Sequence, residues 1–503
     1  MHRRGVLAAA FAAGVGAALP AVADEAGKGD APKLDLPKDK IDLPKFPEPA
    51  SVKQTTRVAG KTLNYTATVG ALPVRDEKGK VVAEVVFTAY VLDGPRDPKR
   101  PVTFAFNGGP GAASVYLNLG AIGPKRVQFG AQGDSPSDSA ELVDNPGTWL
   151  DFTDMVFIDP VGTGFSRSLV DKEETKKRFY GIDADIQYLS RIVYDWLLKY
   201  GRMASPKYVT GESYGGFRGP KITYYLQTKL GVGVNGVVLV SPYLEPPVDL
   251  SPDFSPMAWV STLPSMAASN YERQGKALSP ALMADVEAYA RGEFMTDLAK
   301  GRRDPAAVAR IVDKVTAYTG LDRGFVERSG GRIDSRAYLR ELYRKDGKIG
   351  SWYDSNVTQD DPFPWSPTGR RGDPILDAII APTTSAMVDF VTRVVGWKVE
   401  ARYNALSDEV GENWEKGVEL TNASTDLRQA VAADPKMKVL IVHGYDDLSC
   451  PYFISRLVID QMPISGDVNR VKLSLYPGGH MFYSRPASQA AFRADVMQVF
   501  GAR

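Results

Sequence analysis

Residues 208–216 constrain the fold of this chain more than any other stretch, because they predict a strand that turns abruptly into a helix with a serine at the turn. They contain the pattern Gly-x-Ser-x-Gly around Ser213. A serine at such a turn has a strained backbone, and a Cβ two residues before or after it would collide with the turn. Gly211 and Gly215 have no Cβ. The stretch therefore indicates a nucleophile elbow, although a simple Gly-Ser turn can have the same five letters.

Short apolar runs recur on both sides of this stretch and predict buried strands. They occupy residues 102–106, 155–158, 208–209, 237–240 and 438–442. Most of them run into Gly, Asp or Ser within a few residues, and helix-spaced apolar residues lie between them. Strands that are apolar throughout are buried on both faces, as in a parallel sheet covered by helices. We therefore expect an α/β fold with a mostly parallel central sheet, whose ligands bind beyond the carboxyl ends of the strands.

Changes in composition divide the chain into five parts. Residues 1–23 contain two arginines, an apolar run and an Ala-Val-Ala sequence, which together are typical of a signal peptide. Residues 24–51 are rich in Lys, Asp and Pro and predict a flexible tether. The α/β core is expected over residues 52–244 and 435–503. Between these two parts, residues 245–434 lack the strand-helix rhythm and predict a mainly helical lid insertion.

Composition argues against several classes of partner. The formal net charge of +1 is unlike that of a protein that binds nucleic acid or an anionic membrane surface, because both require clustered positive charge. Outside the predicted signal peptide, we expect no membrane-spanning segment. Because of its predicted signal peptide, the protein is expected to be exported, to the periplasm or as a secreted protein. Its single cysteine, Cys450, excludes a disulfide within the chain, so the fold must depend on its apolar core.

Two later runs end in residues that could complete a catalytic triad with Ser213. Residues 439–450 predict a core strand that ends in a loop with the acid Asp447. Residues 473–481 predict a strand followed by two glycines and His480. The order serine, acid, histidine is the order of the α/β-hydrolases and differs from that of the chymotrypsin and subtilisin folds.

The choice of base and acid has few alternatives. Outside the predicted signal peptide the chain has two histidines, His443 and His480. His443 lies within or at the end of a predicted core strand, where a hydrogen-bonded structural histidine is expected, so His480 is the predicted base. Asp447 is preferred to Asp446 as the acid, because Asp446 can simply end the strand.

A glycine-rich loop at residues 106–111 follows a predicted strand and supplies a candidate oxyanion hole. Glycines let backbone N–H groups approach a ligand closely, and the loop is similar to the oxyanion loop of esterases. It would be paired with the N–H of Tyr214, the residue after the nucleophile. A phosphate-binding loop is the alternative, but the stretch lacks the Walker lysine and the Gly-x-Gly-x-x-Gly spacing.

Taken together, these motifs resemble the serine carboxypeptidases, in a bacterial-type member. The resemblance is carried by residues 107–111, 159–166, 211–215, 447–450 and 478–481. It implies an α/β-hydrolase fold and the release of C-terminal residues of peptides through an acyl-enzyme on Ser213. It implies no cofactor and no metal.

The resemblance also implies the roles of individual residues. Ser213, Asp447 and His480 would form the triad, and the N–H groups of Gly109 and Tyr214 would form the oxyanion hole. The free carboxylate of the peptide would bind at Asn107 and Glu212. The expected substrate-binding residues are Asn107, Gly108, Glu212, Cys450 and Met481.

The chain departs from the family pattern in three places. It has no cysteine pair for the family's disulfides, it has Ala121 where the family often places a glutamate, and Met481 continues into Phe-Tyr-Ser-Arg. The same triad would also serve an esterase, an acyltransferase or another serine peptidase. A catalytically inactive binding or scaffold protein is a further alternative, which the complete set of catalytic residue types argues against.

Overall fold

The computed structural model describes residues 43–95, 97–128, 136–137, 140–245, 255–366, 372–415 and 422–502. The predicted signal peptide and most of the predicted tether lie outside these residues. Within them, β1 begins at Ala50.

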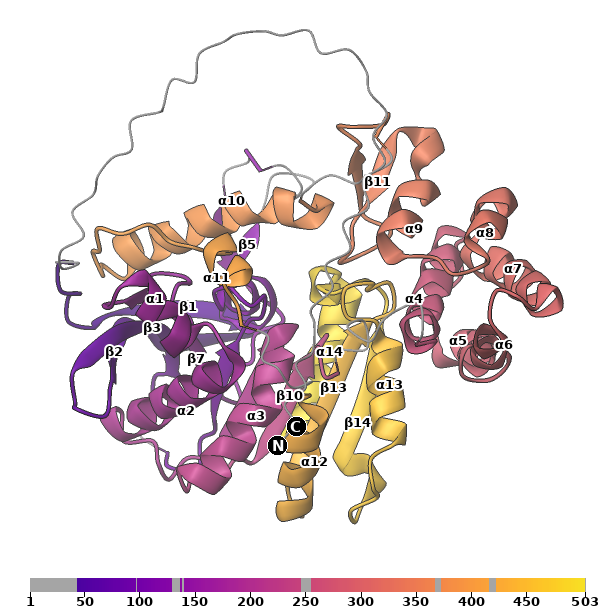
Figure 1. Cartoon of the computed structure of the whole chain (residues 1–503). Helices are drawn as coiled ribbons and strands as arrows, with labels where there is room; N and C mark the ends of the chain where they lie inside the picture. The colour runs from indigo at the N-terminus through magenta and orange to yellow at the C-terminus, as the bar shows by residue number, and fades with distance from the viewer. Residues whose placement is uncertain are drawn as a thin grey trace, which may run out of the picture. The chain divides into compact units, whose positions relative to one another are not determined.

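A mixed central sheet organises the fold (Figure 1). Its strand order is β1-β2-β3-β7-β4-β9-β10-β13-β14, and β8 pairs with β3. In this order, each strand from β7 to β14 is parallel to its neighbour, whereas the pairs β1-β2, β2-β3 and β3-β7 are antiparallel. The expected α/β fold with a mostly parallel sheet is confirmed. The bounds are β1 (Ala50–Val58), β2 (Lys61–Arg75), β3 (Val81–Leu92), β4 (Val102–Phe106), β7 (Asp154–Ile158), β8 (Arg167–Ser168), β9 (Lys207–Glu212), β10 (Gly236–Val240), β13 (Lys438–Gly444) and β14 (Val471–Tyr476).

Apolar side chains on both faces of the sheet explain why its strands are apolar throughout. In β10, Val237 and Leu239 belong to one apolar cluster, while Val238 and Val240 belong to another. Successive side chains of a strand point to opposite faces, so each cluster covers one face. We name them the α3-side core and the α14-side core. Helices α2 (Ile182–Lys199), α3 (Tyr214–Lys229) and α12 (Ser424–Ala433) contribute to the first, and η1 (Leu117–Ile122), α10 (Pro374–Asp389), η5 (Phe390–Val394) and α14 (Pro486–Phe500) to the second.

A third apolar cluster, the helical core, is formed mainly by the predicted insertion. Pro280 and Pro305 occupy the first turns of two of its helices, after the capping residues Ser279 and Asp304. Tyr452 and Phe453, which follow β13, complete the cluster. Its helices are α4 (Met257–Arg273), α5 (Pro280–Tyr289), η3 (Ala290–Phe294), α6 (Met295–Lys300), α7 (Pro305–Thr319), α8 (Arg323–Ser329) and α9 (Ser335–Leu342).

The predicted insertion therefore divides into two parts by its packing. The helices from α4 to α9 surround their own core, whereas α10 and α12 pack into the two cores of the sheet. Its two short strands, β11 (Lys348–Gly350) and β12 (Thr358–Asp360), pair only with each other. The boundaries 245–434 stay a prediction.

The structure also describes further elements. They are β5 (Lys125–Gln128), β6 (Glu141–Asp144), α1 (Lys172–Phe179), η4 (Arg344–Asp346), α11 (Asp408–Glu412), α13 (Tyr452–Asp460), η6 (Val468–Arg470) and η7 (Phe482–Ser484).

One described helical stretch, Pro374–Val394, has the length and hydropathy of a membrane span. Four of its side chains, Ala386, Met387, Phe390 and Val391, are buried in the α14-side core. Core helices of soluble proteins can have the same length and hydropathy. The expectation of no membrane partner stays a prediction.

Candidate active site

Ser213 lies between β9 and α3, as the Gly-x-Ser-x-Gly pattern predicts. Its φ of 61° and ψ of −123° place it in a region that non-glycine residues rarely adopt. A Cβ on Gly211 would lie 1.9 Å from the carbonyl oxygen of Gly215, and a Cβ on Gly215 would lie 2.2 Å from that of Phe106. Both glycines are therefore required by close backbone contacts, and the turn holds a conformation that costs about 1–3 kcal/mol.

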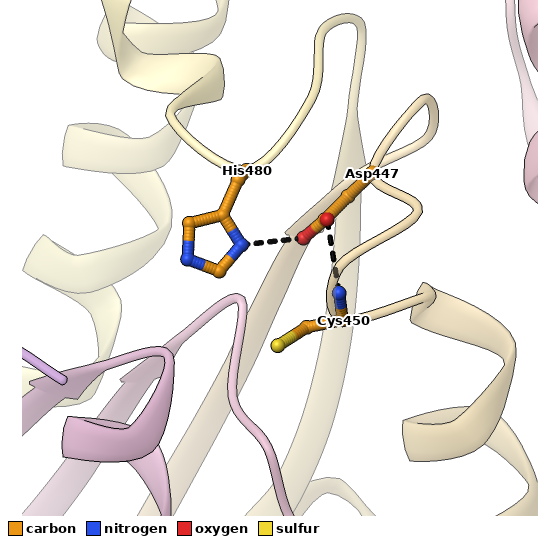
Figure 2. A group of neighbouring side chains, drawn as sticks. All are labelled: Asp447, Cys450 and His480. Carbon is orange, nitrogen blue, oxygen red and sulfur yellow. Dashed lines mark hydrogen bonds and ion pairs between the residues drawn. The ribbon is translucent and has the colours of Figure 1, made fainter. Parts of the chain in front are cut away.

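His480 and Asp447 meet from two loops at the carboxyl end of the sheet. Nδ1 of His480 lies 2.7 Å from Oδ2 of Asp447 (Figure 2). Oδ1 of Asp447 accepts hydrogen bonds from the backbone N–H groups of Ser449 (2.8 Å) and Cys450 (3.0 Å) and from the hydroxyl of Ser449 (2.7 Å). Both oxygens of this buried carboxylate therefore have partners, which fixes the side of the carboxylate that faces the imidazole.

The charge of the imidazole depends on opposing effects. Burial lowers the pKa of His480, but the hydrogen-bonded Asp447 and the nearby Glu212 raise it, and the net shift is upward. A raised pKa makes the neutral imidazole a stronger base for a serine hydroxyl.

The backbone of the histidine loop is held from both sides. The N–H of His480 donates to the carbonyl of Tyr353 (2.5 Å), and the hydroxyl of Ser241 donates to the carbonyl of His480 (2.8 Å). The N–H of Gly479 donates to Asp354 (3.0 Å). Residues of the predicted insertion thus position the loop. No signal in the sequence indicates Tyr353 or Asp354, because their partners lie more than a hundred residues away.

His443 has the buried, structural environment that the sequence predicts. Its Nε2 lies 2.8 Å from the hydroxyl of Ser455. Burial lowers its pKa to about 4, so the ring stays neutral.

Asp446 lies in a group of charged residues. Nη2 of Arg485 lies 3.7 Å from its carboxylate and also pairs with Asp354 at 3.0 Å. Arg485 also pairs with Glu272 of α4. Burial, followed by the charges of Asp354 and Glu272, raises the pKa of Asp446 well above its usual range.

We therefore expect Asp446→Asn to stabilise the protein at pH 8 more than at pH 5. A carboxyl whose pKa is raised on folding contributes stability below its unfolded pKa and loses it as the pH rises through the folded pKa. The amide removes the charge, and the gain at pH 8 should be about 1–3 kcal/mol, the scale of a poorly paired buried polar group. Thermal unfolding at the two pH values measures it. An equal loss of stability at both values would contradict the expectation.

The glycine-rich loop lies against the elbow. A Cβ on Gly108 would lie 2.4 Å from the backbone nitrogen of Tyr214, so the loop approaches that nitrogen closely. Nη1 of Arg218 donates to the carbonyl of Asn107 (2.7 Å), and Nε of Arg218 pairs with Asp185 at 2.6 Å, both side chains being buried. This ion pair fixes the loop and was not predicted from the sequence.

Glu212 and Asn107, predicted to act together, form a hydrogen bond beside the elbow. Nδ2 of Asn107 donates to Oε2 of Glu212 at 2.6 Å, and the hydroxyl of Tyr483 donates to Oε1 at 2.8 Å. Burial raises the pKa of Glu212, partly opposed by the charge of His480 and by these two hydrogen bonds. Tyr483 was missed as a contact, although its segment was noted as a departure from the family.

Cys450 and Met481 are the other predicted substrate contacts. Cys450 lies beside Asp447 and His480, and Met481 follows His480 in the chain. Burial raises the pKa of the Cys450 thiol, an effect that the side chain of Ser213 partly opposes. Met481 is partly buried against the α14-side core.

Three of these residues have the chemistry of metal ligands. Ligand atoms of Asp447, Cys450 and His480 lie within 4.8 Å of one another. Metal binding requires a thiolate, whereas the pKa of this thiol is raised. Nδ1 of His480 is already bonded to Asp447. The hydrogen bond between His480 and Asp447 and the protonated thiol therefore do not suit a metal ion.

Comparison with known proteins indicates which family this chain is similar to. Residues 84–271 match the model of the family described as serine carboxypeptidase. The comparisons support the resemblance of this chain to the serine carboxypeptidase family. Serine carboxypeptidase-like 50 of Arabidopsis thaliana is 30% identical over 160 residues, which are 31% of this chain and 33% of the relative. Serine-type carboxypeptidase F of Aspergillus niger is 30% identical over 158 residues, 31% of this chain and 26% of the relative. The matches therefore span a third or less of these curated relatives.

A solved structure supports the fold. The crystal structure of Kex1(delta)p, a prohormone-processing carboxypeptidase from Saccharomyces cerevisiae, aligns with a TM-score of 0.54 and 16% identity. The alignment covers 86% of this chain and 91% of the other. The expected α/β-hydrolase fold is confirmed.

Proposed function

We propose that the protein is a serine carboxypeptidase that removes C-terminal residues from peptides. The observation that carries the proposal is the buried, hydrogen-bonded pair of Glu212 and Asn107. Glu212 directly precedes Ser213 in the chain. A carboxyl group that is protonated at this position can donate a hydrogen bond to the free carboxylate of a peptide. An esterase for neutral substrates has no need of such a group.

The proposed chemistry is acyl transfer through the triad. Neutral His480 takes the proton of the Ser213 hydroxyl through Nε2, while Asp447 holds Nδ1–H and stabilises the imidazolium. The serine oxygen attacks the last peptide carbonyl, and the N–H groups of Gly109 and Tyr214 stabilise the oxyanion. His480 then gives the proton to the leaving amine. Water attacks the acyl-enzyme in the same way and regenerates the serine.

The proposed site for the free C-terminus is built from two donors. Oδ1 of Asn107 accepts from the N–H of Leu117 at 2.9 Å, so its NH₂ group donates to Glu212 and has a second hydrogen for the substrate. Protonated Glu212 would supply the other hydrogen bond. We propose Gly108, Cys450 and Met481 as further walls of the substrate site.

The experiment that tests the function follows which residues leave a set of peptides with free or amidated C-termini. Release of single residues from the free C-terminus supports a carboxypeptidase. Internal cleavage, or turnover of simple esters alone, would contradict it and favour another serine peptidase or an esterase.

We expect Glu212→Gln to remove the pH dependence of KM for peptides with a free C-terminus. Because the pKa of Glu212 is raised, its protonated form persists above the usual range of a carboxyl and is lost as the pH rises through that pKa. Ionised Glu212 repels the peptide carboxylate, so KM of the native protein should rise about tenfold to a hundredfold at high pH, the scale of a hydrogen bond to a charged group. Glutamine cannot ionise, so KM should stay nearly constant.

The matched substrate for this prediction is the same peptide with a C-terminal amide. It has no charge at the C-terminus, so its KM should change little with pH in either protein. The acid limb of kcat belongs to His480, which must be neutral to act as a base, and both substrates should share it. Identical KM profiles for acid and amide would remove the main support for a carboxypeptidase.

We also propose that the protein is an exported, bacterial-type member of the family, in the periplasm or the medium. The support is the sequence of residues 1–23, in which two arginines precede an apolar run and a cleavage pattern.

A further inference from the structure

The segment after His480 contacts the residue before the nucleophile through one hydroxyl group, that of Tyr483. Tyr483 lies in η7, three residues beyond the proposed base, and its side chain is buried. Its hydroxyl donates to Oε1 of Glu212 at 2.8 Å. The other oxygen of Glu212 accepts from Asn107 at 2.6 Å. Each oxygen of the buried carboxyl group therefore has one side-chain donor.

The two donors differ in what they can do when Glu212 takes up a proton. Oδ1 of Asn107 accepts from the N–H of Leu117, which directs the NH₂ group to Glu212. A neutral carboxyl group keeps one carbonyl oxygen, to which the NH₂ group of Asn107 can still donate. Its other oxygen carries the proton and is a weak acceptor. The hydroxyl of Tyr483, which donates to Oε1, therefore bonds best to ionised Glu212.

We propose that Tyr483 is a positioning residue that sets the pH range over which the protein accepts a free C-terminus. Its hydroxyl donates to ionised Glu212 and favours that form, and the O–H of protonated Glu212 stays available for the carboxylate of the peptide. This inference rests on the proposed carboxypeptidase function and names the group that controls its specificity.

Other titratable groups also face Glu212, from four further segments. They are Tyr116, Tyr353, Asp447, Cys450 and His480. Burial raises the pKa values of the two tyrosines and of the thiol, so these three groups are neutral when the protein acts. Protonated His480 favours ionised Glu212, whereas the charge of Asp447 opposes it. Tyr483 itself stays neutral, because burial and Glu212 raise its pKa well above the usual range.

We therefore expect Tyr483→Phe to move the rise of KM to higher pH. A hydroxyl that donates to the ionised carboxylate favours that form, so it lowers the pKa of Glu212 and partly offsets the effect of burial. Without the hydroxyl, Glu212 keeps its proton to higher pH. The midpoint of the KM rise for a free-acid peptide should move up by about one pH unit. KM for the C-terminal amide should not change its pH profile.

Tyr476→Phe is the matched control. The hydroxyl of Tyr476 also donates to a carboxylate, Oδ2 of Asp495 at 2.6 Å, but this pair joins β14 to α14 rather than to Glu212. The control removes the same atom and should leave both KM profiles as they are. Thermal unfolding of both variants verifies that they fold.

The variants are compared with Glu212→Gln and with the double variant that adds Tyr483→Phe to it. The double variant should match Glu212→Gln, because Tyr483 acts through Glu212. The inference would be overturned if Tyr483→Phe left the pH profile of KM for the free-acid peptide unchanged. It would also be overturned if the profiles for the acid and the amide shifted equally. If Glu212→Gln itself keeps the native profile, the proposed function fails instead.

If Tyr483→Phe does not fold, a second variant tests the same inference. Fluorotyrosine at position 483 keeps the ring and the hydroxyl but makes the hydroxyl a stronger donor. The KM rise should then move to lower pH, opposite to the shift expected for Tyr483→Phe. No shift, or a shift to higher pH, would overturn the inference.

Discussion

Ser213→Ala and His480→Ala should each lower kcat by about 10⁶, the loss seen when one member of a Ser-His unit is removed. Without the hydroxyl there is no acyl-enzyme, and without the imidazole the hydroxyl keeps its proton. Because the two side chains act as a unit, the double variant should be no slower than either single variant. Steady-state turnover of one peptide by the three purified variants measures the effect.

His443→Ala is the control for the choice of base. His443 is fully buried and bonded to Ser455, so its loss should lower the melting temperature rather than kcat. Turnover is therefore measured well below the melting temperature of each variant. Loss of turnover in a normally melting His443→Ala protein, with turnover kept in His480→Ala, would show that the base was assigned wrongly.

The features that could be predicted from the sequence are those fixed by neighbouring residues. Gly211 and Gly215 are needed because a Cβ on either would meet backbone atoms of the same turn or of the adjoining loop. The apolar runs of the parallel strands follow from burial on both faces, as Val237 and Val238 show in β10. Steric limits at a turn and the periodicity of apolar residues can both be recognised in a short stretch of sequence.

The features that could not be predicted are contacts between distant segments. Asp354 supports the histidine loop, Arg218 supports the glycine-rich loop, and Tyr483 bonds to Glu212. No spacing in the sequence indicates these pairs, since tertiary packing alone brings them together. The same reason explains α10, which lies in the predicted insertion but packs on the sheet rather than in the helical core.

The last prediction distinguishes the two neighbouring acids. Asp447→Asn should lower kcat by about 10⁴, the loss expected when the imidazole is held in the wrong tautomer. Oδ1 of Asp447 accepts from two backbone N–H groups and from the Ser449 hydroxyl. In the variant, the amide oxygen must take this position, because the NH₂ group cannot accept. The NH₂ group then faces Nδ1 of His480 and donates to it.

An imidazole that accepts at Nδ1 carries its proton on Nε2 and cannot take a proton from Ser213, which is the physical reason for the loss. The hydroxyl of Ser449 lies 3.1 Å from Nδ1 and can hold the correct tautomer in a fraction of molecules. Adding Ser449→Ala should therefore lower kcat of the Asp447→Asn variant further. Asp446→Asn is the matched control and should keep its kcat, because Asp446 faces Arg485. A slow Asp446→Asn protein beside an active Asp447→Asn protein would reverse the assignment of the acid.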